Sequence, residues 1–151
     1  MKFVVLNELG RLVRWLRILG FDTAYFPKQD KAKLAMISLK EDRVILTRDT
    51  RISKYGGYRT FRVDSDSYKE QVKQVIEGLN LKIEEDKLFT RCVVCNAGIE
   101  AIDKNEVKDK VPEYVFKTQE YFSKCPKCER IYWRGTHWGN TKKILKEAGL
   151  S

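Results

Sequence analysis

The sequence predicts an α/β fold, in which a parallel sheet flanked by helices is followed by a small metal-binding module. Over roughly the first 80 residues, short apolar runs alternate with amphipathic helical patterns. Such alternation is typical of a parallel sheet, whose ligands lie outside the carboxyl ends of its strands. Beyond residue 90 the alternation stops, and two close pairs of cysteines follow.

The first two strands and two helices follow from short sequence patterns. A strand is expected at residues 2–5, and the helical pattern over 9–19 ends at Gly20, a residue suited to a helix C-terminus. Residues 23–26 predict a second strand. Asp30 can then cap a helix that runs to about residue 40.

The clearest strand of the sequence covers residues 43–47, RVILT. Its continuous apolar and β-branched character is typical of a central parallel strand. A short helix is expected at 49–55 and a further strand at 58–63. A helix capped by Ser65 or Asp66 follows, and its apolar face is formed by Tyr68, Val72, Val75, Ile76 and Leu79.

A charged connector over residues 80–87 marks a change in character. We therefore expect two parts, residues 1–88 as the α/β domain and residues 89–151 as a cysteine-containing module. A strand is expected at 114–117, inside the long stretch between the cysteine pairs, and a short helix at about 140–148.

The charge balance favours an anionic partner. The chain has 30 Lys and Arg against 21 Asp and Glu, a formal charge of +9. Nucleic acid is the natural partner for such a protein, although a protein that is simply basic fits the composition equally well. No stretch approaches the roughly 20 apolar residues of a membrane span, and we expect neither a span nor a signal peptide.

The cysteine pairs predict a zinc site. Cys92 and Cys95 form one C-x-x-C pair, Cys125 and Cys128 form another, and 29 residues separate the two. Two such knuckles can build a closed tetrahedral site, in which zinc stabilises the fold without doing chemistry. Disulfides, a redox-active pair and an iron–sulfur cluster are the alternatives. Close pairs suit metal in a reducing compartment, so a cytoplasmic location is expected.

The single histidine and an arginine stripe are weaker signals. His137 is expected to pack or to form hydrogen bonds, since the four-cysteine set needs no further ligand. Arg11, Arg14 and Arg17 lie opposite the leucines of the first helix. They form either a solvated face or a row of phosphate contacts, and Arg48 is a further candidate for contacting RNA.

Carboxylates at the strand ends decide whether the protein is an enzyme. Asp49 follows the strand 43–47, where it serves either as a helix N-cap or as a metal ligand. Phosphodiester hydrolysis with magnesium or manganese needs several converging carboxylates. The other candidates are Glu8 after the first strand, Asp30 or Asp22 after the second, and Asp64 or Asp66 after the fourth.

Seven segments together resemble a known family. They are 9–17 (LGRLVRWLR), 19–23 (LGFDT), 45–49 (ILTRD), 91–96 (RCVVCN), 111–115 (VPEYV), 125–128 (CPKC) and 132–138 (YWRGTHW). In this order they are similar to the PIN-like RNase domain with a C-terminal zinc ribbon, known from the C-terminus of the Mut-seven exonuclease. The resemblance implies a PIN-like sheet, a magnesium- or manganese-dependent ribonuclease and a structural zinc ribbon.

The resemblance carries over to Asp49 most directly, and more loosely to Asp30, Asp64 and Asp66. One position departs from it: the family has an aspartate at the end of the first strand, where this chain has Leu6. Glu8, nearby, is the candidate substitute. The leading hypothesis is therefore a metal-dependent ribonuclease. The alternatives are an RNA-binding protein with a weakened or inactive site, and a zinc-ribbon adaptor that binds protein.

Overall fold

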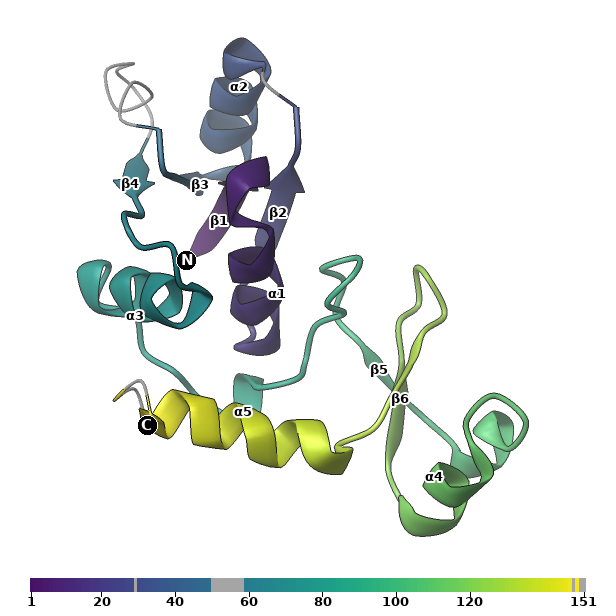
Figure 1. Cartoon of the computed structure of the whole chain (residues 1–151). Coiled ribbons are helices and arrows are strands. Elements are labelled where there is room, and N and C mark those ends of the chain that lie inside the picture. Colours follow the sequence, from purple (N-terminus) through teal and green to yellow (C-terminus); the bar gives the residue numbers. More distant parts are fainter. Residues whose placement is uncertain (29, 50–58, 148, 150–151) are drawn as a thin grey trace.

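Figure 1 shows the chain as a computed structural model, in which a helix-covered sheet is joined to a smaller cysteine-containing part. The structure describes residues 1–28, 30–49, 59–147 and 149, without the side chains of 136–139. The helix expected at 49–55 lies almost entirely outside these residues, and so does the side chain of His137.

The larger sheet is parallel throughout, as predicted. Its strands are β1 (Lys2–Leu6), β2 (Thr23–Phe26), β3 (Arg43–Thr47) and β4 (Thr60–Arg62), in the order β2-β1-β3-β4. Val4 of β1 is in register with Ala24 on one side and Ile45 on the other. Every residue of β3 is buried, which explains why its sequence is apolar without alternation.

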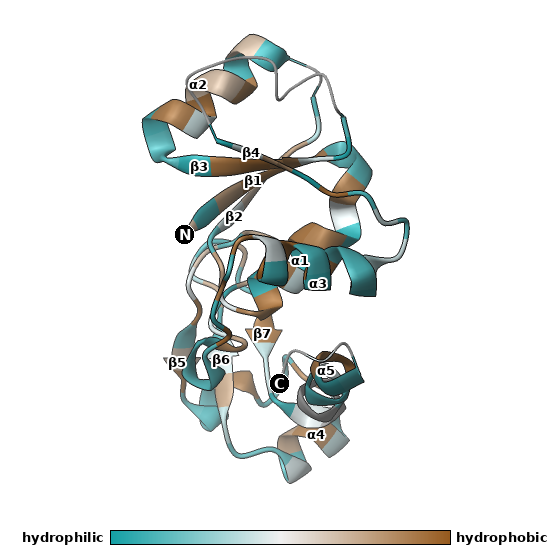
Figure 2. Ribbon diagram, turned by 90° about the vertical axis from the view of Figure 1, so that its left-hand side faces the viewer, coloured by the Kyte–Doolittle hydropathy of each residue, from teal (hydrophilic) through white to brown (hydrophobic). Residues whose placement is uncertain are grey.

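Helices cover both faces of this sheet (Figures 1 and 2). The short turn η1 (Asn7–Leu9) leads into α1 (Gly10–Ile18), which packs with α3 (Tyr68–Gly78) on one face. Helix α2 (Lys31–Glu41) covers the other face. The main core lies on the α1 side and is built from Phe3, Val5, Leu12, Leu16, Val44, Leu46, Val72, Val75 and their neighbours. The predicted α/β fold with a parallel sheet is therefore confirmed.

The C-terminal part contains a small antiparallel sheet, which joins β5 (Glu100–Ile102), β6 (Phe122–Lys124) and β7 (Ile131–Tyr132) in that order. The turns η3 (Glu85–Lys87) and η4 (Lys104–Val107) precede and follow β5. Two residues of β6, Phe122 and Lys124, pair with Ile102 and Glu100 of β5. The stretch between the cysteine pairs thus contains an antiparallel strand pair, formed by residues other than the predicted 114–117.

Residues 114–117 are helical, so the prediction of a strand there was wrong. Helix α4 (Glu113–Thr118) starts directly after Pro112, and Lys117 forms an ion pair with Glu113 one turn earlier at 2.9 Å. Val115 is buried against Val107 and Phe122. Burial of one face and the ion pair across one turn favour the helix over the β propensity of its valine and aromatic residues.

Helix α5 (Gly135–Glu147) begins five residues before the predicted start at residue 140 and joins the two parts. Leu145 is 4% exposed and belongs to the main core beside the sheet. Lys69 of α3 lies 3.7 Å from Glu147, which adds a contact between the two parts. Side chains from both sides of residue 88 thus share the main core. No helix of the described chain is long and apolar enough to cross a membrane.

Candidate functional site

The Glu8 carboxylate and the segment that carries Asp49 meet at the carboxyl ends of the central strands β1 and β3. Glu8, just past β1, accepts hydrogen bonds from the Thr47 hydroxyl at 3.0 Å and from the Arg48 backbone amide at 3.2 Å. The backbone amide of Asp49 donates to the same Thr47 hydroxyl at 3.0 Å. Thr47 thus joins Glu8 to the segment that carries Asp49, as expected for neighbouring strand ends.

Leu6 itself faces the apolar interior. It is 9% exposed and packs in the smaller core with Val4, Phe26, Leu34 and Ile45. The residue that stands where the family has an aspartate is therefore part of the core. Glu8, two residues later, is exposed and supplies the carboxylate that reaches β3.

Asp30 is occupied as a helix cap. Its carboxylate accepts a hydrogen bond from the backbone amide of Lys33 at 3.1 Å, which satisfies one of the unpaired amides at the start of α2. Asp22 precedes β2 and lies at the amino end of the sheet, so the prediction that it follows the second strand was wrong. It is therefore not at the edge that Glu8 and Asp49 share.

Asp64 and Asp66 are held by polar partners after β4. The Asp64 carboxylate lies 3.2 Å from Arg62, and it also accepts from the Gln74 side-chain amide at 3.2 Å. Asp66 forms an ion pair with Arg48 at 2.6 Å. Arg48, predicted to contact RNA, therefore connects the ends of β3 and β4 across the same edge of the sheet.

The donor set at this edge fits a hard divalent cation. Magnesium and manganese bind carboxylate and hydroxyl oxygens, and magnesium usually takes one or two carboxylates together with water and substrate phosphate. Glu8 and Asp49 supply two carboxylates from adjacent strand ends. Within the described part of the chain, however, no three acidic groups have their oxygens within 4.8 Å of one another.

The arginines of α1 have three different surroundings. Arg11 is exposed, and its guanidinium lies 4.1 Å from the centre of the Tyr68 ring. Arg14 is also exposed. Arg17 is 7% exposed, so its side chain is not on the surface where Arg11 and Arg14 lie and is not placed to contact RNA as predicted.

Arg17 instead joins α1 to the first cysteine knuckle. Its guanidinium donates to the carbonyl oxygens of Val93 at 2.9 Å, Val94 at 3.2 Å and Thr23 at 3.0 Å. Burial lowers the pKa of Arg17, while Cys92, Cys95 and Asp22 act in the opposite direction. A guanidinium stays protonated even when it is buried. Arg17 therefore provides a charged donor in the contact between α1 and the first cysteine knuckle, which is called the joint below.

A second group of contacts reinforces this joint. The Asn96 side-chain amide donates to Asp22 at 2.6 Å, and its oxygen accepts from the Thr23 backbone amide at 2.9 Å. Arg43 donates to the same oxygen of Asp22, Oδ1, at 2.8 Å. Burial raises the pKa of the Asp22 carboxyl, but the hydrogen bonds from Asn96 and Arg43 outweigh it, and the net pKa is lowered.

The four cysteines form the predicted metal centre. The sulfur atoms of Cys92, Cys95, Cys125 and Cys128 all lie within 4.8 Å of one another, and all four thiols are free of disulfides. In each knuckle the residue after the second cysteine has a left-handed backbone, Asn96 at φ 67° and Glu129 at φ 65°. The same turn is thus built twice, which brings the four sulfurs to one point, as zinc requires.

The two thiols of the first knuckle have opposite pKa shifts. Burial raises the pKa of the Cys92 thiol, but contact with the Tyr132 hydroxyl at 3.0 Å and hydrogen bonds from the Cys95 and Val94 amides lower it to about 6. The pKa of Cys95 is raised to about 12 by its hydrogen bond with Cys128, by burial and by the charge of the neighbouring thiols. Negative charges on neighbouring thiolates repel one another. A bound divalent cation would offset that repulsion, and metal-bound thiols deprotonate outright.

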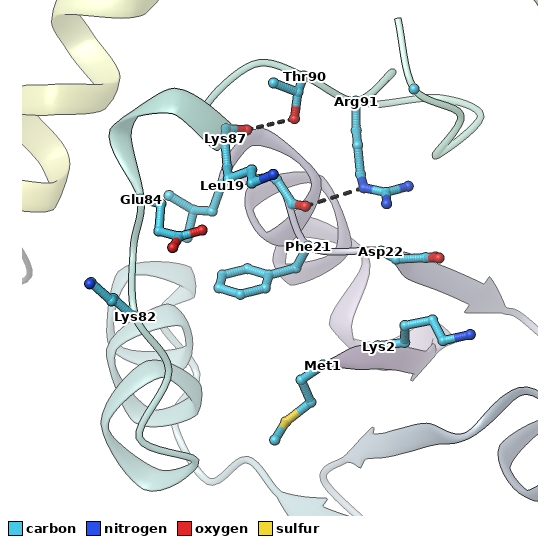
Figure 3. A pocket seen from close by; sticks show the side chains of 12 residues that line it. Met1, Lys2, Leu19, Phe21, Asp22, Lys82, Glu84, Lys87, Thr90 and Arg91 are labelled. Carbon is cyan, nitrogen blue, oxygen red and sulfur yellow. Dashed lines mark hydrogen bonds between the residues drawn. The ribbon is translucent and has the colours of Figure 1, made fainter.

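A cavity of about 430 Å³ lies away from the acidic edge. It opens at the amino end of the sheet and is lined by Lys2, Asp22, Lys82, Glu84, Lys87 and Arg91, among others (Figure 3). Arg91 donates to the Gly20 carbonyl at its wall. Because this cavity is at the opposite end of the strands from Glu8 and Asp49, it does not belong to their site.

Comparison with known proteins identifies the family. The model of the Mut7-C RNAse domain matches residues 1–145. The exonuclease mut-7 homolog of Homo sapiens is 32% identical over 96 residues, which is 60% of this chain and 11% of that protein. The chain thus spans about a tenth of the length of that relative. No solved structure matches. With nearly its whole length matched, the chain belongs to the Mut7-C RNase domain family.

Proposed function

We propose that the protein is a metal-dependent ribonuclease that hydrolyses RNA phosphodiester bonds at the edge shared by β1 and β3. One observation carries the proposal: the Glu8 carboxylate reaches across to Thr47 and Arg48, next to Asp49. Membership of an RNase domain family supports a nuclease, and the +9 charge supports an anionic substrate.

Glu8 and Asp49 would hold magnesium or manganese, with Asp30 and Asp64 as more distant acids of the same site. When bound, such an ion lowers the pKa of an attacking water and stabilises the leaving oxygen. Thr47 keeps the Glu8 carboxylate in place by its hydroxyl, so that Glu8 supplies the carboxylate which Leu6 does not. Turning the exposed Glu8 side chain toward a metal ion would cost less free energy than moving the backbone of β1 to bring residue 6 there.

The arginines around this edge would bind the RNA backbone. Arg11 and Arg14 are exposed on α1, which begins directly beyond Glu8. Arg48 lies beside Asp49 and is already oriented by Asp66. Guanidinium groups form bidentate contacts with phosphate, which suits all three positions to positioning the substrate.

The four-cysteine centre would hold zinc with a structural role. Four thiolates leave no coordination position for water, so the ion would not take part in hydrolysis. Its contribution would be to fix the first knuckle, whose carbonyls accept from Arg17.

A second candidate function is RNA binding without cleavage. The burial of Leu6 and the lack of three gathered acids among the described residues favour it. It predicts RNA affinity that falls steeply with salt, and no metal-dependent turnover.

Cleavage of single-stranded RNA in manganese separates the two functions. Asp49→Asn and Glu8→Gln should each lower the rate by at least about 100-fold if these carboxylates hold the ion. Glu106→Gln, which changes an exposed acid in η4, is the matched control and should retain full activity. Equal rates for wild type and Asp49→Asn, or no cleavage by either, would remove the catalytic assignment.

A further inference from the structure

A cavity of about 380 Å³ lies where α1, the first cysteine knuckle, β7 and α5 meet. Its described walls include four aromatic residues, Trp15, Phe89, Tyr132 and Trp133. All four are partly exposed. Burial of an aromatic ring against such walls is favourable, because ring stacking adds to the area removed from water.

Two of these rings are fixed by packing with neighbours. Trp15 stacks on Tyr68 with ring centres 5.9 Å apart and an angle of 17° between the planes. Trp133 packs edge to face on Phe122, with ring centres 6.4 Å apart. A site whose rings are already held in place loses little conformational entropy when it binds a planar ligand.

Charged and polar groups complete the cavity on one side. Arg14 and Asn140, both exposed, line it together with the aromatic residues. Arg11 lies one turn before Arg14 on the same helix, over the Tyr68 ring. The site therefore offers flat apolar walls next to a cation, the combination that binds an unpaired base and its adjoining phosphate.

The cavity also lies in line with the acidic edge. Helix α1 begins immediately after η1, which contains Glu8, and runs toward the cysteine-containing part. Trp15 is four positions after Arg11, which is about 6 Å along a helix axis. An RNA strand held by Arg11 and Arg14 therefore extends from Glu8 and Asp49 toward the cavity.

We propose that this cavity binds one unpaired base of a single-stranded RNA whose backbone lies along Arg11 and Arg14. The choice of RNA as the ligand rests on the proposed function. The size and lining of the cavity are independent of that proposal. The charge of the neighbouring side chains favours this occupant over an apolar peptide side chain, since exposed Arg14 lines the cavity and exposed Arg11 lies one turn before it on α1.

The test compares two labelled RNAs of about eight nucleotides, one of uridines and one with the same backbone but no bases. Both are titrated by fluorescence anisotropy into zinc-loaded full-length Asp49→Asn, so that cleavage does not intervene. The uridine strand should bind about 5- to 150-fold more tightly than the abasic strand, the range expected for stacking of one base.

Filling the cavity should abolish this preference. Ile144, a partly buried residue of the cavity wall, is changed to Trp, and Lys143→Trp places the same side chain on an exposed position of α5 as the matched control. Ile144→Trp should bind both strands as the parent binds the abasic one, whereas Lys143→Trp should keep the preference. If circular dichroism shows that Ile144→Trp does not fold, Asn140→Trp, at an exposed residue of the wall, replaces it.

A parent protein with no preference for bases, or a preference that survives cavity filling, would overturn the proposal. Failure of the proposed function gives a different result: the base preference is present, but wild type does not cleave RNA. Cleavage by wild type without a base preference removes the cavity proposal alone.

Discussion

The guanidinium of Arg17, on the first helix, donates at 2.9 Å to the carbonyl of Val93, inside the first cysteine knuckle. This contact links residues 76 positions apart in the chain. It ties the first cysteine knuckle to α1, the helix that packs against the sheet. The position of the knuckle and that of the helix are therefore linked.

Replacing Arg17 should destabilise the protein far more than replacing its exposed neighbour. Arg17→Leu leaves the carbonyls of Val93 and Thr23 without their charged donor and should lower the free energy of unfolding by about 2–3 kcal/mol. Arg14→Leu, on the exposed side of the same helix, should change it by less than about 0.5 kcal/mol. Urea denaturation of the zinc-loaded proteins measures both, and equal effects would contradict the assigned contact.

The Asp22 carboxylate should stabilise the fold only above acid pH. Its pKa is lowered in the folded protein because hydrogen bonds from Asn96 and Arg43 outweigh burial. The stabilisation is therefore fully present above the unfolded pKa of about 3.9 and is lost as pH falls through the lower folded pKa.

Asp22→Asn should accordingly be less stable than wild type by about 1–3 kcal/mol at pH 7, and the difference should shrink below about pH 4. Urea denaturation at several pH values gives the difference at each pH, so that loss of metal in acid affects both proteins alike. Glu106→Gln serves as the exposed control and should differ little from wild type. A difference that is constant from pH 7 to 3 would contradict the shift.

Gly20 should not tolerate a side chain. Its φ is +93°, and a Cβ there would lie 2.5 Å from the Lys87 carbonyl oxygen, part of the backbone. Gly20→Ala should therefore cost about 2–3 kcal/mol. Gly98→Ala, where a Cβ meets nothing within 4 Å, should be close to neutral. Thermal unfolding of the two variants tests the comparison, and similar melting temperatures would refute it.

Removal of the metal should loosen more than the cysteine knuckles. A strong chelator should release about one zinc per chain. Because Arg17 and Asn96 bind the first knuckle to α1 and β2, hydrogen exchange should accelerate in these elements as well as in β5–β7. If hydrogen exchange accelerates only in residues 91–132, the contacts of Arg17 and Asn96 do not extend the effect of zinc removal to α1 and β2.

The elements that were predicted correctly are those whose sequence pattern reflects local burial. Residues 44–46 of β3 are apolar without alternation because both faces of this strand are covered. Asp30 was a predictable cap, since its side chain needs only the amide of Lys33, three residues later. The cysteine pairs were equally readable, because each knuckle is a local turn.

The errors came from contacts between distant segments. Arg17 lies opposite the leucines on a helical wheel, but the knuckle at Val93 covers it in the folded chain. Val115 sits in a segment with strand propensity, and its burial against Val107 and Phe122 favours a helix. The sequence pattern of a segment shows its hydrophobic periodicity. It does not show which distant segment will pack against it in the fold.

The place of Leu145 among the core residues of the sheet restricts how the C-terminal part can be replaced. A fragment that ends near residue 90 would expose the apolar surface that Leu145 covers. Any substitute for the cysteine-containing part would therefore need an apolar side chain that covers the same surface. One family model matches residues 1–145, so both parts of the chain lie within a single match.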